Sequence, residues 1–220
     1  MTDLSVTISH LENYPLITQK RADYLIFKQI FGLIKSKEHL TTEGLYKIIA
    51  LKAGLNLGFP EQLKTHFPTV ISVDRPRVAN QNIKDPNWLA GFIDGDGSFR
   101  IKINKSSSTK SGYSVFLVLS IVQHGRDEDL LKSFNKYLNC GVTYRRSGNA
   151  ITFSVVKFSD IKDIIIPFLN KYPLLGVKSK DFEYFCKGAE LIKSKKHLTE
   201  EGLDQLHKIK NGMNTGRKFF

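Results

Sequence analysis

The 220-residue sequence contains only two cysteines, Cys140 and Cys186. Two cysteines are too few for a disulfide framework or a structural zinc site, which indicates a reducing compartment. The first residues, Met-Thr-Asp-Leu-Ser-Val-Thr, form neither a basic nor an apolar segment, and no long apolar run follows. We therefore predict no secretory signal, no transmembrane helix and no membrane partner. An Arg-rich transit peptide is also missing, whereas encoding within an organelle stays open.

Acidic residues are the other scarce class. The chain has 21 Asp and Glu against 33 Lys and Arg, which gives a formal net charge of +12. This excess predicts a polyanionic partner, nucleic acid before a membrane surface. Hydrophobic residues make up 41% of the chain, enough for a globular core.

The two ends of the chain carry copies of one segment. Tyr-Pro-Leu at 14–16 recurs at 172–174, and Leu-Ile-Lys-Ser-Lys at 33–37 recurs at 191–195, both at an offset of 158 residues. Each copy predicts two helices. The first covers about 20–37, and Thr41 or Thr199 caps the second. His39 and His197 precede these caps without a second ligand at useful spacing, which argues against a metal site there.

Between the copies, residues 59–85 show little periodicity and several prolines, which predicts a linker. A helix then begins at Pro86. Strict alternation predicts a strand at 99–104, and further strands are expected at 113–123, 141–146 and 150–158. Further helices are expected at 127–138 and 159–170.

The helix that begins at Pro86 has an unusual composition. Asp85 is a suitable N-cap and Pro86 suits the first helical position. Gly91 and Gly95 stand one turn apart, which favours close approach of another backbone at that face. Its last residues include Asp94 and Asp96, where the helix dipole is already negative, so that a bound cation would be stabilising.

Asp-Gly-Asp-Gly at 94–97 is open to two other interpretations. An ordinary turn has the same composition. A helix-loop-helix calcium site is excluded, because Phe99 and Lys105 stand where glycine and glutamate are needed.

Residues 89–97, Leu-Ala-Gly-Phe-Ile-Asp-Gly-Asp-Gly, resemble the signature of the LAGLIDADG homing endonucleases and depart from the family name at Phe92 and Gly95. The resemblance implies an α+β fold, a four-stranded antiparallel saddle backed by helices, here preceded by an extra helical unit. It also implies that two signature helices, from two subunits or two repeats, cross at the centre. Accordingly, we expect residues 1–58 to be the helical tail of an incomplete first repeat, 59–85 a linker, and 86–220 a complete second repeat.

The resemblance further implies a site for Mg²⁺ at the scissile phosphates. Asp96 is expected to bind the metal, with help from the carbonyl of Gly95, whereas Asp94 is expected to be structural near the helix end. Lys157 and Gln123 resemble the lysine and glutamine that order water around the metals. The helix-crossing interface is expected at Ala90, Gly91, Asp94 and Gly95.

DNA contacts are expected from the polar faces of the strands in the major groove. Arg100, Lys102 and Asn104 are the best placed, with Tyr144 and Arg146 from the third strand. Lys105 and Lys110 are expected to touch phosphates, and Arg145 to face the helices or a strand edge.

The leading hypothesis is a site-specific double-strand DNA endonuclease that hydrolyses phosphodiester bonds with a divalent metal. The alternatives are an intron-splicing maturase that binds RNA and a DNA-binding remnant that cuts nothing. Only one signature is present, so a second helix is expected from a homodimer partner or an N-terminal half, and the isolated chain is expected to be inactive. The resemblance also suggests an organellar, mitochondrial location.

Overall fold

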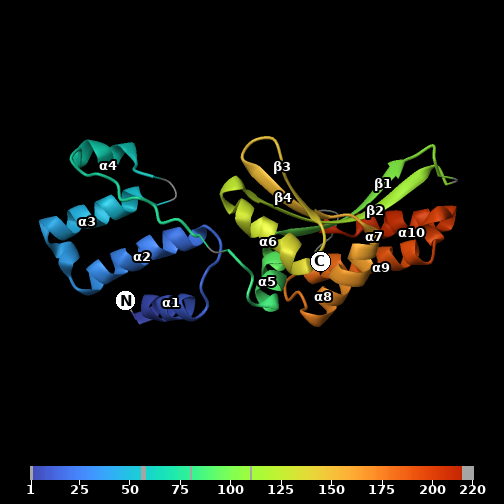
Figure 1. Cartoon of the computed structure of the whole chain (residues 1–220), viewed down its shortest axis with the longest axis horizontal. Coiled ribbons are helices and arrows are strands. Elements are labelled where there is room, and N and C mark those ends of the chain that lie inside the picture. The colour runs from blue at the N-terminus through green and yellow to red at the C-terminus, as the bar shows by residue number, and fades with distance from the viewer. Residues whose placement is uncertain (1, 56–57, 80, 110, 215–220) are drawn as a thin grey trace. The chain divides into compact units, whose positions relative to one another are not determined.

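The computed structural model describes residues 2–55, 58–79, 81–109 and 111–214. The chain divides into two compact units, Met1–Asn82 and Ile83–Phe220 (Figure 1). Among the described residues, no helix has both the length and the apolar content that a membrane crossing requires.

The second unit contains a curved antiparallel sheet with helices on one side (Figure 1). Its strands are β1 (Gly97–Lys105), β2 (Tyr113–His124), β3 (Val142–Arg145) and β4 (Ala150–Val155), in the order β1-β2-β4-β3. Helix α5 (Pro86–Asp96) precedes β1, and α6 (Glu128–Leu138) joins β2 to β3. The predicted four-stranded sheet backed by helices is confirmed.

The helices after the sheet form the rest of the layer. Helix α7 (Phe158–Asp160) continues through a π-helical turn at Ile161–Ile165 into α8 (Ile166–Lys171). The last elements are α9 (Lys178–Lys193), a 3₁₀ turn at Lys196–Leu198, and α10 (Glu200–Asn211).

Alternation along the strands separates a core face from an open face. Phe99, Leu119 and Phe153 are fully buried on the side of the helices. The ring of Phe99 lies 5.1 Å from that of Phe185 in α9, and Phe134 of α6 lies 5.6 Å from Phe153. Arg100, Lys102 and Asn104 are exposed on the other face, so the core leaves the polar face of the sheet free to bind a ligand.

The first unit repeats the last helices of the second. Its elements are α1 (Thr2–Asn13), α2 (Lys20–Lys35), a 3₁₀ turn at Glu38–Leu40, α3 (Thr42–Ala53) and α4 (Glu61–His66). The bounds of α2 and α3 match those of α9 and α10 at the offset of 158 residues. Lys37 and Lys195 both have positive φ, at 62° and 59°. The repeat in the sequence is therefore a repeat of backbone conformation.

The caps of the two copies match as well. The hydroxyl of Thr41 accepts a hydrogen bond from the backbone N–H of Gly44 at 3.0 Å, and Thr199 accepts one from Gly202 at 3.1 Å. A Cβ at either glycine would lie 1.9 Å from a backbone carbonyl oxygen. Glycine is thus required at the same place in both copies.

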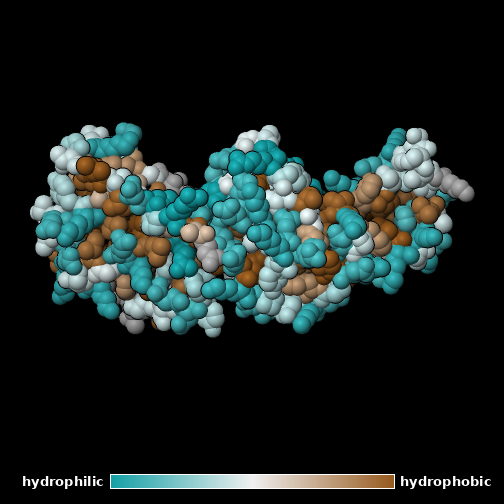
Figure 2. Space-filling model, in the orientation of Figure 1, coloured by the Kyte–Doolittle hydropathy of each residue, from teal (hydrophilic) through white to brown (hydrophobic). Residues whose placement is uncertain are grey.

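The two copies differ in what covers them. In α9, Phe185 is fully buried against the sheet, whereas its counterpart Phe27 in α2 is 37% exposed. Hydrophobic residues accordingly lie at the surface of the first unit in the view of Figure 2. The sheet that covers this face in the second copy has no counterpart among the described residues of the first unit.

The segment 59–85, which we expected to be a linker, contains α4 and packs on the first unit for much of its length. The N–H of Val73 donates to the carbonyl of Ala50 at 3.2 Å, and Arg75 forms an ion pair with Asp23 of α2. Its role as a connection between two repeats stays a prediction.

Candidate active site

Helix α5 ends at the start of the sheet. Its first turn is capped by Asp85, whose carboxylate accepts the N–H of Asn87 at 2.8 Å, and Pro86 stands at the first helical position as expected. A Cβ at Gly97 would lie 2.5 Å from the carbonyl oxygen of Ile93, so glycine allows the chain to pass directly from helix into β1. This junction fixes Asp96 beside the first strand.

Asp96 and Gln123 come together there. The side-chain amide of Gln123, at the end of β2, donates a hydrogen bond to Oδ2 of Asp96 at 2.7 Å. Asp96 itself is exposed. The structure thus unites two of the residues that we expected in one site and leaves the carboxylate accessible to solvent.

A lysine that the sequence analysis missed also lies at this point. The ammonium of Lys178, at the start of α9, donates to the carbonyl oxygen of Gly95 at 2.8 Å. The repeat contained a signal for it, because Lys20 stands 158 residues earlier at the same place in the first copy. Lys178 therefore places a positive charge at the C-terminal end of α5.

Lys157 is placed differently. Its side chain is 75% exposed before α7, and its ammonium lies 3.5 Å from Asp160. Its ion pair is thus with Asp160 rather than with Asp96. A catalytic role for Lys157 stays a prediction, and Lys178 is a second candidate for the same role.

Asp94 holds a loop against the end of α5. Its Oδ2 accepts the backbone N–H groups of Leu175 at 3.0 Å and Gly176 at 2.6 Å. A Cβ at Gly176 would lie 2.9 Å from the Asp94 carboxylate, so the loop approaches closely because residue 176 is glycine. This geometry supports the structural role expected for Asp94.

One face of α5 is open. An added Cβ at Gly91 or Gly95 would meet no atom of the described chain within 4 Å, which supports the expected approach of another helix. Ala90 differs, because it is only 3% exposed and packs inside the second unit. Its assignment to the crossing interface stays a prediction.

The groups at this end of α5 supply only some of the ligands that a metal ion needs. Among the described residues no group of three or more His, Cys, Asp or Glu side chains lies close enough together to bind one. Asp96 offers a carboxylate, and the carbonyl of Gly95 can accept a second contact besides Lys178. Mg²⁺ is usually bound by one or two carboxylates together with phosphate oxygens and water. Hard oxygen donors of this kind suit Mg²⁺, but alone they supply only part of its coordination shell.

Burial raises the pKa of the Cys140 and Cys186 thiols to about 11, so both are protonated at neutral pH.

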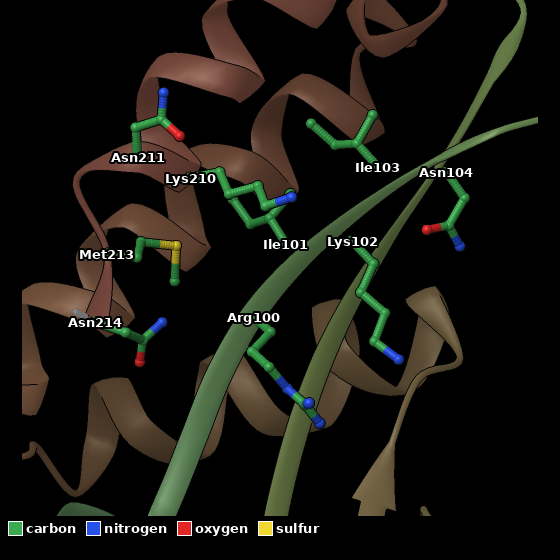
Figure 3. A pocket seen from close by; sticks show the side chains of 9 residues that line it. All are labelled: Arg100, Ile101, Lys102, Ile103, Asn104, Lys210, Asn211, Met213 and Asn214. Atoms are coloured by element: carbon green, nitrogen blue, oxygen red, sulfur yellow. The ribbon is translucent and has the colours of Figure 1, made fainter. Parts of the chain in front are cut away.

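The open face of the sheet lies next to the site. Figure 3 shows Arg100, Lys102 and Asn104 on one side of β1 and Ile101 and Ile103 on the other. In the register, Arg100 lies opposite Val118 and Lys102 opposite Phe116. The residues expected to contact DNA bases from β1 therefore share one face.

The remaining predicted DNA contacts are placed as follows. Tyr144 lies on the open face, because it pairs with Thr152, which pairs with Val122. Lys105 and Arg146 are exposed, and Lys110 lies outside the described residues. Arg145 forms an ion pair with Glu128 of α6, as expected for a side chain that faces the helices.

Comparison with known proteins matches residues 89–189 to the family described as LAGLIDADG endonuclease. A "Probable intron-encoded endonuclease 3" from Neurospora crassa is 40% identical over 206 residues, which cover 93% of this chain and 38% of the relative. The chain thus spans well under half of that relative.

The chain covers a larger share of similar proteins of known structure. The I-SmaMI LAGLIDADG homing endonuclease bound to cleaved DNA has a TM-score of 0.94 and 44% identity, over 96% of this chain and 71% of that chain. I-SmaMI bound to uncleaved DNA target in the presence of calcium ions has a TM-score of 0.91 and 45% identity, over 93% of this chain and 70% of that chain.

Proposed function

The chain belongs to the LAGLIDADG endonuclease family, and we propose that it provides one catalytic half of a site-specific, metal-dependent endonuclease of double-stranded DNA. The observation that carries this proposal is the cluster at the end of α5. The Gln123 amide bonds Asp96 there, and the Lys178 ammonium bonds the carbonyl of the preceding residue, Gly95, beside a basic, exposed sheet face. Binding and cleavage would thus share one rigid sheet.

Each residue has a distinct task in this proposal. Asp96 holds the metal, and the 2.7 Å bond from Gln123 fixes the orientation of its carboxylate. Lys178 holds the end of α5 and offsets the partial negative charge of the helix C-terminus. When bound, Mg²⁺ would polarise a phosphoryl oxygen and lower the pKa of an attacking water.

A second signature helix is needed, because two DNA strands have to be cut and α5 supplies one metal-binding acid, Asp96. The open face at Gly91 and Gly95 is the proposed contact for that helix. The first unit supports a source within a preceding repeat, because its exposed α2 face corresponds to the face of α9 that packs on the sheet. A second copy of this chain is the other source.

The roles of Lys178 and Lys157 can be separated by the same substitution at each. Lys178→Met should lower the rate of cleavage by about 10²–10³-fold, as for other lost charge-stabilising donors, while the affinity for DNA changes far less. Lys157→Met removes the same charge and is the matched control, with little expected effect. Single-turnover cleavage by the chain supplied with a first repeat measures both, and partial recovery in Lys178→Arg would show that the charge matters. A large loss in Lys157→Met alone would restore the original assignment.

DNA binding should depend steeply on salt. The slope of log affinity against log salt is about −0.9 for each phosphate contacted, so several contacts give a total of about −3 or steeper. The measurement is a titration of the chain with duplex DNA at several salt concentrations, with an RNA hairpin as competitor. A flat response would contradict the proposed role of the basic face, and preference for the RNA would favour a maturase.

The intronic and organellar setting is part of the proposal. The relative from Neurospora crassa is named as intron-encoded, and we propose the same encoding for this chain, with action in mitochondria.

A further inference from the structure

The open face of the sheet carries large apolar side chains besides its basic ones. Phe116 and Val122 of β2 are each 43% exposed, and Val142 and Tyr144 of β3 are exposed on the same face. Apolar side chains gathered on one exposed face indicate a binding surface. Phosphate oxygens offer an apolar side chain no favourable contact, so these residues need an apolar group on the ligand.

The neighbouring arginine is oriented across the strands on that face. Nη2 of Arg100 donates to the hydroxyl of Ser120 at 2.9 Å, and Ser120 is only 4% exposed. A guanidinium has five N–H donors, so this bond leaves a fork that can grip the edge of a guanine. The face around Phe116 and Val122 is thus built to contact bases as well as phosphates.

The spacing of these residues matches the spacing of base pairs. Same-face neighbours on a strand are about 6.8 Å apart, the rise of roughly two base pairs. Phe116 and Val122 both lie on β2, and their separation is about 20 Å, or roughly six base pairs. Arg100 lies opposite Val118, between them along the strand.

We propose that Phe116 and Val122 each recognise a thymine through its 5-methyl group in the major groove, roughly six base pairs apart. The thymine methyl is the apolar group that a base pair presents there, and apolar side chains such as Phe contact it. This inference rests on the proposed function, because it requires the open face to bind a DNA duplex.

Replacing thymine by uracil tests this directly, because it removes the methyl group and leaves the hydrogen-bonding edge unchanged. The full chain is first used to select duplexes from a randomised pool at low salt. Each thymine of a selected duplex is then replaced by uracil in turn, and the dissociation constant is measured. Two positions, roughly six base pairs apart, should each lose about fourfold in affinity, the effect of one methyl group left unburied.

Variants assign each position to a residue. Phe116→Ala should abolish the difference between thymine and uracil at one position, and Val122→Ala at the other. Leu198→Ala is the matched control, because Leu198 is similarly exposed, at 46%, but lies between α9 and α10; it should keep both differences. The uracil scan with the unaltered chain does not depend on the folding of any variant.

The outcomes separate this inference from the function on which it rests. Equal binding of thymine and uracil at every position would overturn the recognition of methyl groups while DNA binding stands. So would differences that persist in both alanine variants. Enrichment of no duplex at all would overturn the proposed function together with the inference.

Discussion

Asp96→Asn is expected to abolish DNA cleavage, with a loss of at least about 10³-fold in rate, while the affinity for DNA stays within about tenfold. The substitution keeps the size of the side chain and removes the charge that a divalent metal needs. Because Asp96 is exposed at the end of α5 and accepts a hydrogen bond from the neutral amide of Gln123, we expect the fold to tolerate the change. The measurement is single-turnover cleavage of a bound duplex by the chain supplied with a first repeat, compared with the dissociation constant of the same duplex.

The matched control is Asp94→Asn, the other acid of the signature. Its carboxylate accepts two backbone N–H groups from the loop at Leu175 and Gly176. Loss of the Asp94 charge should lower the thermal stability of the chain, and not only the rate of cleavage. Retained cleavage in Asp96→Asn would show that another residue holds the metal.

The second large effect concerns the number of signature helices. The isolated chain is expected not to cut both strands, because it carries one signature. Supplying a first repeat, fused or as a separate chain, should restore cleavage of both strands from a background near zero. Light scattering and a two-strand cleavage assay on the same sample measure this. A monomer that cuts both strands unaided would contradict the prediction.

Gly91→Leu tests the contact through which the second helix would act. An added Cβ at Gly91 meets no described atom within 4 Å, so the substitution should not destabilise the isolated chain. Glycine inside a helix costs about 1 kcal/mol relative to better helix formers, so the isolated chain should even gain a little stability. Cleavage restored by a first repeat should nevertheless be lost, because a large side chain blocks close approach of the helices. Unchanged cleavage would place the crossing elsewhere.

Most helices and strands were predicted from local or repeated sequence patterns. The cap at Asp85 and the alternation around Arg100 involve neighbouring residues, and the structure has α5 and β1 where these signals place them. The helix pairs were predictable because the same residues occur twice. The third and fourth strands were predicted to end at residues 146 and 158, but β3 ends earlier, at Arg145, and β4 at Val155.

Contacts between distant residues escaped the sequence analysis. The bond between Lys178 and Gly95 joins residues 83 positions apart, and no local pattern marks the lysine. Lys157 was assigned from family resemblance, and its ion pair is formed with Asp160, one turn of helix away. That Gln123 and Asp96 share one site was expected from family resemblance alone, because only the pairing of β1 with β2 brings the two side chains together.

The repeated helical pair has a consequence for local unfolding. Helices α2 and α9 have matching bounds, yet Phe185 of α9 is buried against the sheet and Phe27 of α2 is partly exposed to water. The free energy needed to open α9 therefore includes the loss of its contacts with the sheet, whereas that of α2 does not. Amide hydrogens of α2 should exchange with solvent faster than their counterparts in α9, because local opening is easiest where few apolar contacts are buried. The slowing of that exchange would then report when a second sheet has docked on the first unit.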